Sequence, residues 1–309
     1  FESRNIEDVA NNAICDLKCF NQKLYATTVG GGFYAVDPIS LETECLKEPE
    51  EQYVKNFSNQ YAPICPDSTR IWFHSLNTLF YYDLMNKDVR QVECERLKEI
   101  SSIMEISNMA LTPEGSLLIS TLGESIQEYF PETNSLKPFL PDQVLASCRI
   151  DLSVYDFIID GDIIYFGTNL CGLYKYNTTT FEFENFTHDP NLKYSLSSNN
   201  IRCLYTDRNG LLWLGTNGRG INVLSPSAIK FDGFIHQLVD PLNNNSLSVR
   251  TFLVDKDENL WVGGYYALYR INRKENKIER FLEGNPAYSL LMDHIYQDTL
   301  WVGIEGAGL

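Results

Sequence analysis

Seven short runs of strand-forming residues recur along this chain of 309 residues, and each run ends in a small polar residue or glycine. Aligned at one equivalent position, they are anchored at Tyr25, Trp72, Leu118, Tyr165, Trp213, Trp261 and Trp301. The steps between anchors are 47, 46, 47, 48, 48 and 40 residues. A period of this length with several strands per unit is typical of a β-propeller. The repeat constrains the architecture strongly and the chemistry very little, because a propeller can carry many unrelated functions on its loops.

The best-formed unit spans residues 195–234 and predicts a meander of four antiparallel strands. An apolar strand over 201–205 is followed by Asp-Arg-Asn-Gly, which is typical of a hairpin turn. A second strand over 211–214 leads to a glycine-rich turn at 215–220. A third strand over 221–224 and a fourth near 229–234 complete the unit. We therefore expect one propeller blade from each repeat.

The other units keep the same phase. The third strand is expected to start seven or eight residues past each anchor, at Phe33, Leu79, Ile126, Leu173, Ile221, Leu268 and Leu309. The prediction is an all-β fold, a seven-bladed β-propeller of four-stranded antiparallel blades that occupies residues 1–309 as a single domain. The last blade is incomplete in this chain, and residues near Phe1 are expected to supply its outer strand, which would cover an exposed sheet edge. One helical turn is expected near residues 91–105.

Composition narrows the classes of partner. The 25 Lys and Arg residues stand against 41 Asp and Glu residues, for a formal charge of −16, which disfavours nucleic acid and anionic membrane surfaces. No run of 18 apolar residues occurs, so no membrane insertion by this segment is expected. The eight cysteines form no CxxC pair, and Cys15 and Cys203, at equivalent positions of two repeats, are expected to be small buried residues. Because the final residues break off inside a repeat, we expect the sequence to be part of a larger receptor.

Residues 186–224 resemble the two-component regulator propeller repeat. The pattern of that family is an aromatic residue, an Asp-Pro loop, Ser-Leu-Ser, Asn, an apolar strand, Asp-x-x-Gly, Leu-Trp-x-Gly-Thr and a final glycine. It falls here on Phe186, Asp189, Pro190, Ser195, Leu196, Ser197, Asn200, Asp207, Gly210, Leu212, Trp213, Gly215, Thr216 and Gly220. The next unit repeats it at Asp240, Pro241, Ser246, Leu247, Ser248, Asp255, Leu260, Trp261 and Gly263. Units one to four lack most of the loop motif, and Tyr25, Leu118 and Tyr165 stand where the pattern has Trp.

This resemblance implies the periplasmic sensor region of a hybrid two-component histidine kinase of the Bacteroides type, an inner-membrane protein that responds to glycan fragments. Such proteins carry further domains of the same parent chain, including the kinase. No phosphoacceptor His motif, ATP-binding loop or receiver aspartate pattern occurs in these residues, so this segment itself is expected to have no enzymatic activity. The ligand chemistry of the family resides in variable loops, and no binding residue transfers from the motif.

Catalytic candidates are few. The four histidines, His74, His188, His236 and His294, lie in different units and form no known catalytic signature. The glycine-rich GTNGRG at 215–220 has no following helix to bind phosphate, and DKDEN at 255–259 lacks the spacing of a calcium loop, so both are expected to be turns. We expect no catalytic residue, no metal site and no cofactor.

Binding is the function that the loops favour. The loops after the second strands cluster on one face of a propeller and carry amide, guanidinium, carboxylate and phenol groups. The candidate ligand-binding residues are Asn77, Asn169, Asn217, Arg219, Tyr265, Tyr266 and Glu305. Polar groups of this kind hydrogen-bond sugar hydroxyls, and flat rings cover the apolar faces of sugars. An oligosaccharide is therefore the expected ligand.

Two alternatives stay open from the sequence. One is a secreted propeller lyase that resembles the streptogramin lyases, for which a catalytic His beside a metal-binding Glu would be needed, with His74 and Glu305 as the candidates. The other is a scaffold for protein interaction or homodimerisation that binds no small ligand. The identity of the ligand and the oligomeric state do not follow from the residues.

Overall fold

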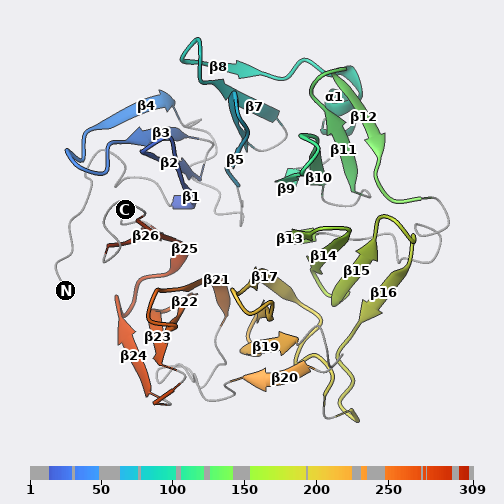
Figure 1. Cartoon of the computed structure of the whole chain (residues 1–309), viewed down its shortest axis with the longest axis vertical. Coiled ribbons are helices and arrows are strands. Elements are labelled where there is room, and N and C mark those ends of the chain that lie inside the picture. Colours follow the sequence, from blue (N-terminus) through green and yellow to red (C-terminus); the bar gives the residue numbers. More distant parts are fainter. Residues whose placement is uncertain are drawn as a thin grey trace. The chain divides into compact units, whose positions relative to one another are not determined.

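The computed structural model shows an all-β propeller fold whose blades are antiparallel meanders (Figure 1). The described residues are 14–29, 32–48, 63–75, 78–101, 106–121, 126–141, 154–192, 194–224, 231–234, 248–272, 274–275, 277–293 and 299–305. They group into two compact units, one of residues 1–153 and 289–309 and one of residues 154–288, which we call unit 1 and unit 2. The predicted single seven-bladed domain stays a prediction.

Unit 1 contains three four-stranded sheets, in each of which the strands pair in sequence order. The first sheet has β1 (Ile14–Phe20), β2 (Lys23–Thr28), β3 (Phe33–Val36) and β4 (Thr43–Lys47). The second has β5 (Cys65–Pro66), β6 (Arg70–Ser75), β7 (Thr78–Asp83) and β8 (Asp88–Gln91). A helix, α1 (Glu95–Ser101), precedes the third, which has β9 (Ile106–Leu111), β10 (Leu117–Thr121), β11 (Gln127–Phe130) and β12 (Ser135–Pro138). A hairpin of β25 (Ala287–Met292) and β26 (Leu300–Ile304) begins at the end of unit 2 and lies mostly in unit 1.

Unit 2 contains three further four-stranded sheets of the same order (Figure 1). The first has β13 (Val154–Asp160), β14 (Ile163–Thr168), β15 (Leu173–Asn177) and β16 (Phe183–Phe186). The second has β17 (Ile201–Thr206), β18 (Leu212–Thr216), β19 (Ile221–Leu224) and β20 (Phe231–Phe234). The third has β21 (Val249–Val254), β22 (Leu260–Gly264), β23 (Leu268–Asn272) and β24 (Lys277–Phe281). The described residues thus form six complete blades and one hairpin, which confirms the predicted blade architecture.

The predicted strand phase is confirmed closely. Strand β19 has the bounds expected for it, and β3, β15 and β23 begin at Phe33, Leu173 and Leu268 as predicted. The strand expected over 211–214 runs on through Thr216, because Gly215 still pairs with Ile221 across β18 and β19. The expected helical turn is α1. The predictions for Phe1 and Leu309 lie outside the described residues.

All four tryptophans are held in the same way, by the aspartate that forms the preceding hairpin turn. The indole Nε1 donates to a carboxylate oxygen in the pairs Trp72–Asp67 (2.7 Å), Trp213–Asp207 (3.1 Å), Trp261–Asp255 (2.9 Å) and Trp301–Asp293 (2.9 Å). A buried indole N–H needs an acceptor, and the aspartate supplies it while its other oxygen accepts backbone N–H groups of the turn in three of these pairs. The Asp and Trp of the repeat pattern are therefore structural.

Neighbouring blades within each unit are joined by a second aspartate. Asp16 on β1 accepts from the backbone N–H of Ile64, 48 residues further along, at 2.8 Å. Asp156 on β13 accepts from Leu204, also 48 residues further along, at 2.7 Å. Glycine in the second strand lets the next blade approach, since a Cβ on Gly215 would lie 2.6 Å from Val249 of β21. These contacts fix the spacing between blades.

Candidate functional site

The candidate site is one edge of unit 2, where each second strand ends and the third begins. Antiparallel pairing places the start of each first strand at this same edge, because Ile201 pairs with Thr216 and Val249 pairs with Gly264. We call this the loop edge. It carries the loops between β14 and β15, between β18 and β19, and between β22 and β23.

Two of these loops have the same turn. Thr168 and Thr216 are fully buried, and the hydroxyl of each donates to the carbonyl of a glycine four residues later, Gly172 and Gly220, at 2.7 Å. Gly220 has a φ of +74°, a conformation that favours glycine. Gly218 and Gly220 of GTNGRG therefore serve a tight turn, as the sequence predicts, whereas Gly215 belongs to strand β18.

Hydrogen bonds connect the loop edge across all three blades of unit 2. The Asn200 amide Nδ2 donates to Asn169 Oδ1 at 3.0 Å, and the Asn217 backbone N–H donates to the Asn200 carbonyl at 3.0 Å. The Ser248 hydroxyl donates to Asn217 Oδ1 at 2.8 Å, and the Tyr265 backbone N–H donates to the Ser248 carbonyl at 3.1 Å. A continuous set of contacts thus holds Asn169, Asn217 and Tyr265 in fixed relative positions.

The Ser-Leu-Ser segment of the repeat pattern is a structural element of this edge. The Ser195 hydroxyl accepts from the Asp189 backbone N–H and donates to the Asp189 carbonyl, which closes the Asp-Pro loop on itself. Leu196 is buried, and the Ser197 hydroxyl donates to the side chain of Asn222 at 2.8 Å. These residues shape the loop.

Exposed groups on this edge come from the loops after the second strands. Tyr265 is 38% exposed and its ring meets that of Tyr266 edge to face, with centroids 5.0 Å apart. Asn217 and Arg219 are exposed, and their turn is held by the Arg219 backbone N–H, which donates to the Thr216 hydroxyl at 3.1 Å. An aromatic pair beside amide and guanidinium groups can cover the apolar face of a sugar and bind its hydroxyls.

The structure brings together five of the seven predicted residues: Asn169, Asn217, Arg219, Tyr265 and Tyr266. Glu305 belongs to unit 1, where it follows β26 and its charge contributes to raising the pKa of the Cys15 thiol, after the larger effect of burial. Asn77 lies outside the described residues.

The residues of the lyase alternative do not form an open site among the described residues. His74 is only 1% exposed on β6, within unit 1. No group of three or more His, Cys, Asp and Glu side chains able to hold a metal ion is found in the part of the chain that the structure describes. Cys15 and Cys203 are buried as predicted, and burial raises the pKa of both thiols.

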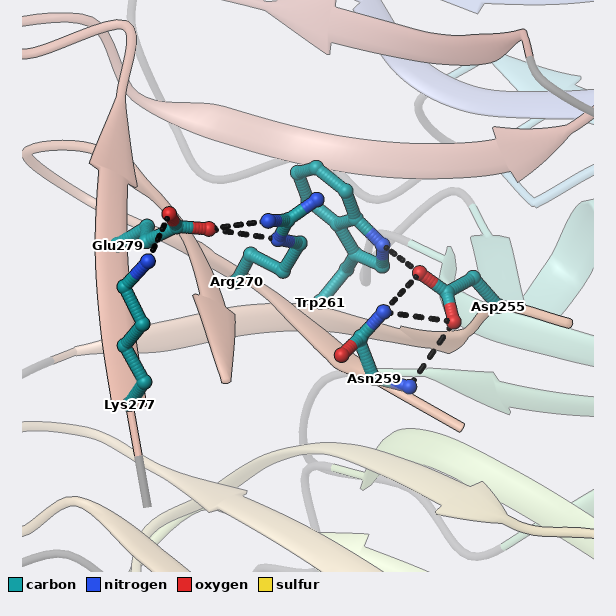
Figure 2. Close-up of polar contacts among 6 residues, drawn as sticks. All are labelled: Asp255, Asn259, Trp261, Arg270, Lys277 and Glu279. Carbon is teal, nitrogen blue, oxygen red and sulfur yellow. Dashed lines mark hydrogen bonds and ion pairs between the residues drawn. The ribbon is translucent and has the colours of Figure 1, made fainter. Parts of the chain in front are cut away.

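The DKDEN segment is a hairpin turn, as predicted, with its first carboxylate engaged inside the protein (Figure 2). Asp255 accepts from the Asn259 backbone and side chain and from the indole of Trp261. Arg270 lies over the Trp261 ring at 5.7 Å and binds Glu279, which also binds Lys277. Hydrogen bonds from Lys277 and Arg270 lower the pKa of the Glu279 carboxyl. These charges are exposed or half-buried, so we expect them to add little stability.

Two arginines of the loop edge were not predicted as site residues. Arg202 and Arg250 follow the first residue of β17 and of β21, and they are 7% and 6% exposed. Their shared signal in the sequence is an apolar-Arg pair repeated at the 48-residue period in Ile201-Arg202 and Val249-Arg250. In an alternating strand, a polar residue after an apolar one is expected to face solvent. Periodicity alone therefore does not show that Arg202 and Arg250 are buried.

Comparison with known proteins identifies the repeat that contains this edge. Residues 195–218 match the family model described as "Two component regulator propeller". The match covers this one repeat of the chain. The matched repeat runs from Ser195 to the loop that holds Asn217, so it includes the Ser-Leu-Ser segment, the Trp213–Asp207 pair and Arg202. No curated protein matches the chain in sequence.

Solved structures share the fold of this repeat protein at low sequence identity. The extracellular domain assigned to the hybrid two component system BT3049 of B. thetaiotaomicron is 16% identical over 99% of this chain, with a TM-score of 0.75. PorZ, a surface component of the type-IX secretion system of Porphyromonas gingivalis, is 16% identical over 96% of this chain, with a TM-score of 0.68. YCF48 bound to D1 peptide is 10% identical over 96%, with a TM-score of 0.66.

The lengths of these proteins differ from that of the chain. The chain covers 41% of the BT3049 domain and 46% of PorZ, but 92% of YCF48. None of the helices among the described residues has the length and apolar content needed to span a lipid bilayer.

Proposed function

We propose that this chain is an extracytoplasmic ligand-recognition propeller of a membrane two-component signalling protein, located in the periplasm, and that it responds to glycan fragments. The segment itself acts by binding, and the kinase activity resides in further domains of the parent chain. The matched repeat and the fold shared with the BT3049 extracellular domain support the signalling role.

The observation that carries the proposal is the composition of the loop edge. Tyr265 and Tyr266 present an aromatic surface, and Asn217 and Arg219 present polar groups on the adjacent blade. The hydrogen bonds through Ser248 hold these groups in place before a ligand arrives. A preorganised site loses less conformational entropy on binding, so an edge built in this way suits a small, hydroxyl-rich ligand.

Calorimetry with the purified chain and a panel of neutral and acidic oligosaccharides tests the proposal. We expect at least one glycan to bind, and we expect Tyr265→Ala to weaken that binding by about tenfold or more through loss of ring stacking. Phe181→Ala is the matched control, since Phe181 is an aromatic residue that is 63% exposed in the turn between β15 and β16, at the opposite edge of its blade. This control is expected to bind as the unmodified chain does.

Two results would contradict the proposal in different ways. No heat with any glycan, together with concentration-dependent dimerisation in analytical ultracentrifugation, would favour the interaction scaffold. The peptide complex of YCF48, whose length this chain nearly matches, makes that the second candidate. Equal losses in Tyr265→Ala and Phe181→Ala would mean that the ligand binds elsewhere.

A further inference from the structure

Leu170 departs from a glycine pattern in the loops that follow the second strands. In five repeats the third strand is expected eight residues past the anchor. Five residues past the anchor, four of these repeats have glycine, at Gly30, Gly123, Gly218 and Gly306, and the fifth has Leu170. Leu170 and Gly218 have φ values of +70° and +79°, a region that glycine adopts freely and that is unfavourable for leucine because of its Cβ.

Packing does not compensate this strain. The Leu170 side chain is 69% exposed, so it gains little from burial. A left-handed residue is not unusual by itself, since Leu41, Lys87 and Phe181 have φ values of +62°, +56° and +61° in turns between third and fourth strands. That turn position accepts several kinds of side chain, whereas the position of Leu170 is otherwise glycine. A strained residue without a packing role indicates a function.

The loop around Leu170 is held against the segment that leads into the next blade. Asn169 Oδ1 accepts from Asn200 Nδ2 at 3.0 Å on one side of Leu170. On the other side, the Gly172 backbone N–H donates to the Asn199 carbonyl at 2.8 Å. Contacts on both sides therefore present the exposed leucine in a fixed position.

The Asp-Pro loop adds further apolar groups to this edge. It begins after β16, at the end where Phe186 pairs with Leu173, the first residue of β15. Its Leu192 is 61% exposed, and the Leu192 N–H and carbonyl bind the Asp189 carbonyl and the Ser195 N–H, each at 3.1 Å. Among the described residues, eight large apolar side chains are exposed, and half of them lie at the loop edge of unit 2: Leu170, Leu192, Tyr194 and Tyr265. Exposed apolar groups that gather on one face mark a binding surface.

We propose that Leu170 and Leu192 form an apolar subsite for one end of an extended glycan, whose other end lies on Tyr265. The subsite is continuous with the proposed glycan surface, because the hydrogen bonds of the loop edge run from Asn169 to Tyr265. Leucine has no ring face, so it contributes by covering the methyl and C–H groups of a sugar.

The position of the two ends sets the length of the ligand. Leu170 and Tyr265 lie on the first and third blades of unit 2. Sheets that pack face to face lie about 10 Å apart, so two blade steps separate these ends by about 20 Å. A mono- or disaccharide is too short to reach both ends. The inference rests on the proposed function and adds the size of its ligand: an oligosaccharide of several units.

Calorimetry with size-graded fragments tests the subsite, using arabinan, xylan and galactan oligosaccharides of two to eight units. In the series that binds, we expect affinity to rise about tenfold or more from the shortest fragment to the longest. Leu170→Gly, alone and together with Leu192→Ser, is expected to remove about fivefold or more of the affinity for the longest fragment and to leave the shortest unchanged. Phe181→Gly is the matched control, because Phe181 is a similarly exposed left-handed residue at the opposite edge of the same blade.

The same variant tests whether Leu170 has a structural role. Release of backbone strain offsets the larger entropy of glycine in the unfolded chain. Leu170→Gly is therefore expected to keep its melting temperature within about 3 °C of that of the unmodified chain. A larger fall would make Leu170 a structural residue and would overturn the inference.

The binding outcomes separate this inference from the proposed function. If a glycan binds but the double variant Leu170→Gly, Leu192→Ser binds every length as the unmodified chain does, the subsite is overturned and glycan recognition stands. If no fragment of any series binds, the subsite falls, and the wider oligosaccharide panel decides on glycan recognition. If the unmodified chain self-associates in analytical ultracentrifugation and Leu170→Gly abolishes this, the apolar groups serve a protein interface and the glycan subsite is overturned.

Discussion

The two units build the same backbone frame and place different side chains on it. Both have four-stranded blades, an aspartate that binds the backbone of the next blade, and a register shift in the first strand. At that shift, unit 1 places the buried thiol of Cys15 on β1, whereas unit 2 places Tyr155, Arg202 and Arg250. The backbone arrangement is therefore a property of the repeat, whereas the chemical character of each blade at this place depends on the side chain at the register shift.

The turns between third and fourth strands show the same contrast. In unit 1 the acceptor for two backbone N–H groups is aspartate, at Asp37 and Asp83. In unit 2 it is asparagine, at Asn177 and Asn272. A neutral and a charged side chain support the same turn, so the turn requires a side-chain oxygen placed to accept the two N–H groups and does not require a negative charge.

Truncation of the anchor residue to alanine is expected to have the largest effect on the free energy of unfolding. Trp213 in unit 2 and Leu118 in unit 1 are both fully buried at the same place in their blades. We expect Trp213→Ala to lower the free energy of unfolding by about 4 kcal/mol and Leu118→Ala by about 3 kcal/mol, as cavity formation dictates. Urea denaturation followed by fluorescence measures both, and a Leu118→Ala cost below 1 kcal/mol would show that the blade with the aliphatic anchor packs loosely.

The close approach of neighbouring blades gives an intermediate effect in both units. A Cβ on Gly215 would lie 2.6 Å from Val249 of the next blade, and one on Gly303 would lie 2.6 Å from Ile14. We expect Gly215→Ala and Gly303→Ala each to cost about 2 kcal/mol through overpacking. Gly115 has a φ of +86° but open space around it, so Gly115→Ala is the control for backbone strain alone. A Gly303→Ala cost no larger than that of Gly115→Ala would break the parallel between the units.

The charged turns give the smallest effect, and it depends on pH. Backbone N–H groups of Ser40 and Ile39 lower the pKa of Asp37, and those of Asn86 and Met85 lower that of Asp83, with the Asn86 side chain also contributing. A lowered folded-state pKa adds stability above the unfolded value of about 4, and this is lost as pH falls through the folded value.

In the double variant Asp37→Asn, Asp83→Asn, the free energy of unfolding is therefore expected to depend less steeply on pH in this acidic range. The turns at Asn177 and Asn272 carry no titrating group and are expected to contribute nothing to that dependence. Urea midpoints at pH 7 and in the acidic range measure this. Identical slopes for the variant and the unmodified chain would mean that the two carboxylates have the same pKa in the folded and unfolded chain.

Most of the frame was predictable because it is local. Strands within a blade are joined by short hairpins, so apolar runs and turn residues such as Asp207 and Gly210 suffice to set their phase. The loop edge was predictable for the same reason, since Asn217, Arg219, Tyr265 and Tyr266 follow directly from the ends of second strands. Glu305 shares that position in the repeat, yet it belongs to the other unit, and the sequence cannot show this.

The sequence by itself determined the repeat, the order of strands in each blade, and the loops that follow the second strands, because all of these depend on residues close together in the chain. Only the tertiary structure decided that Arg202 and Arg250 are buried and share one edge with Tyr265. Their proximity depends on a register shift within each strand and on the packing of strands 48 residues apart, and periodicity along the chain reports neither.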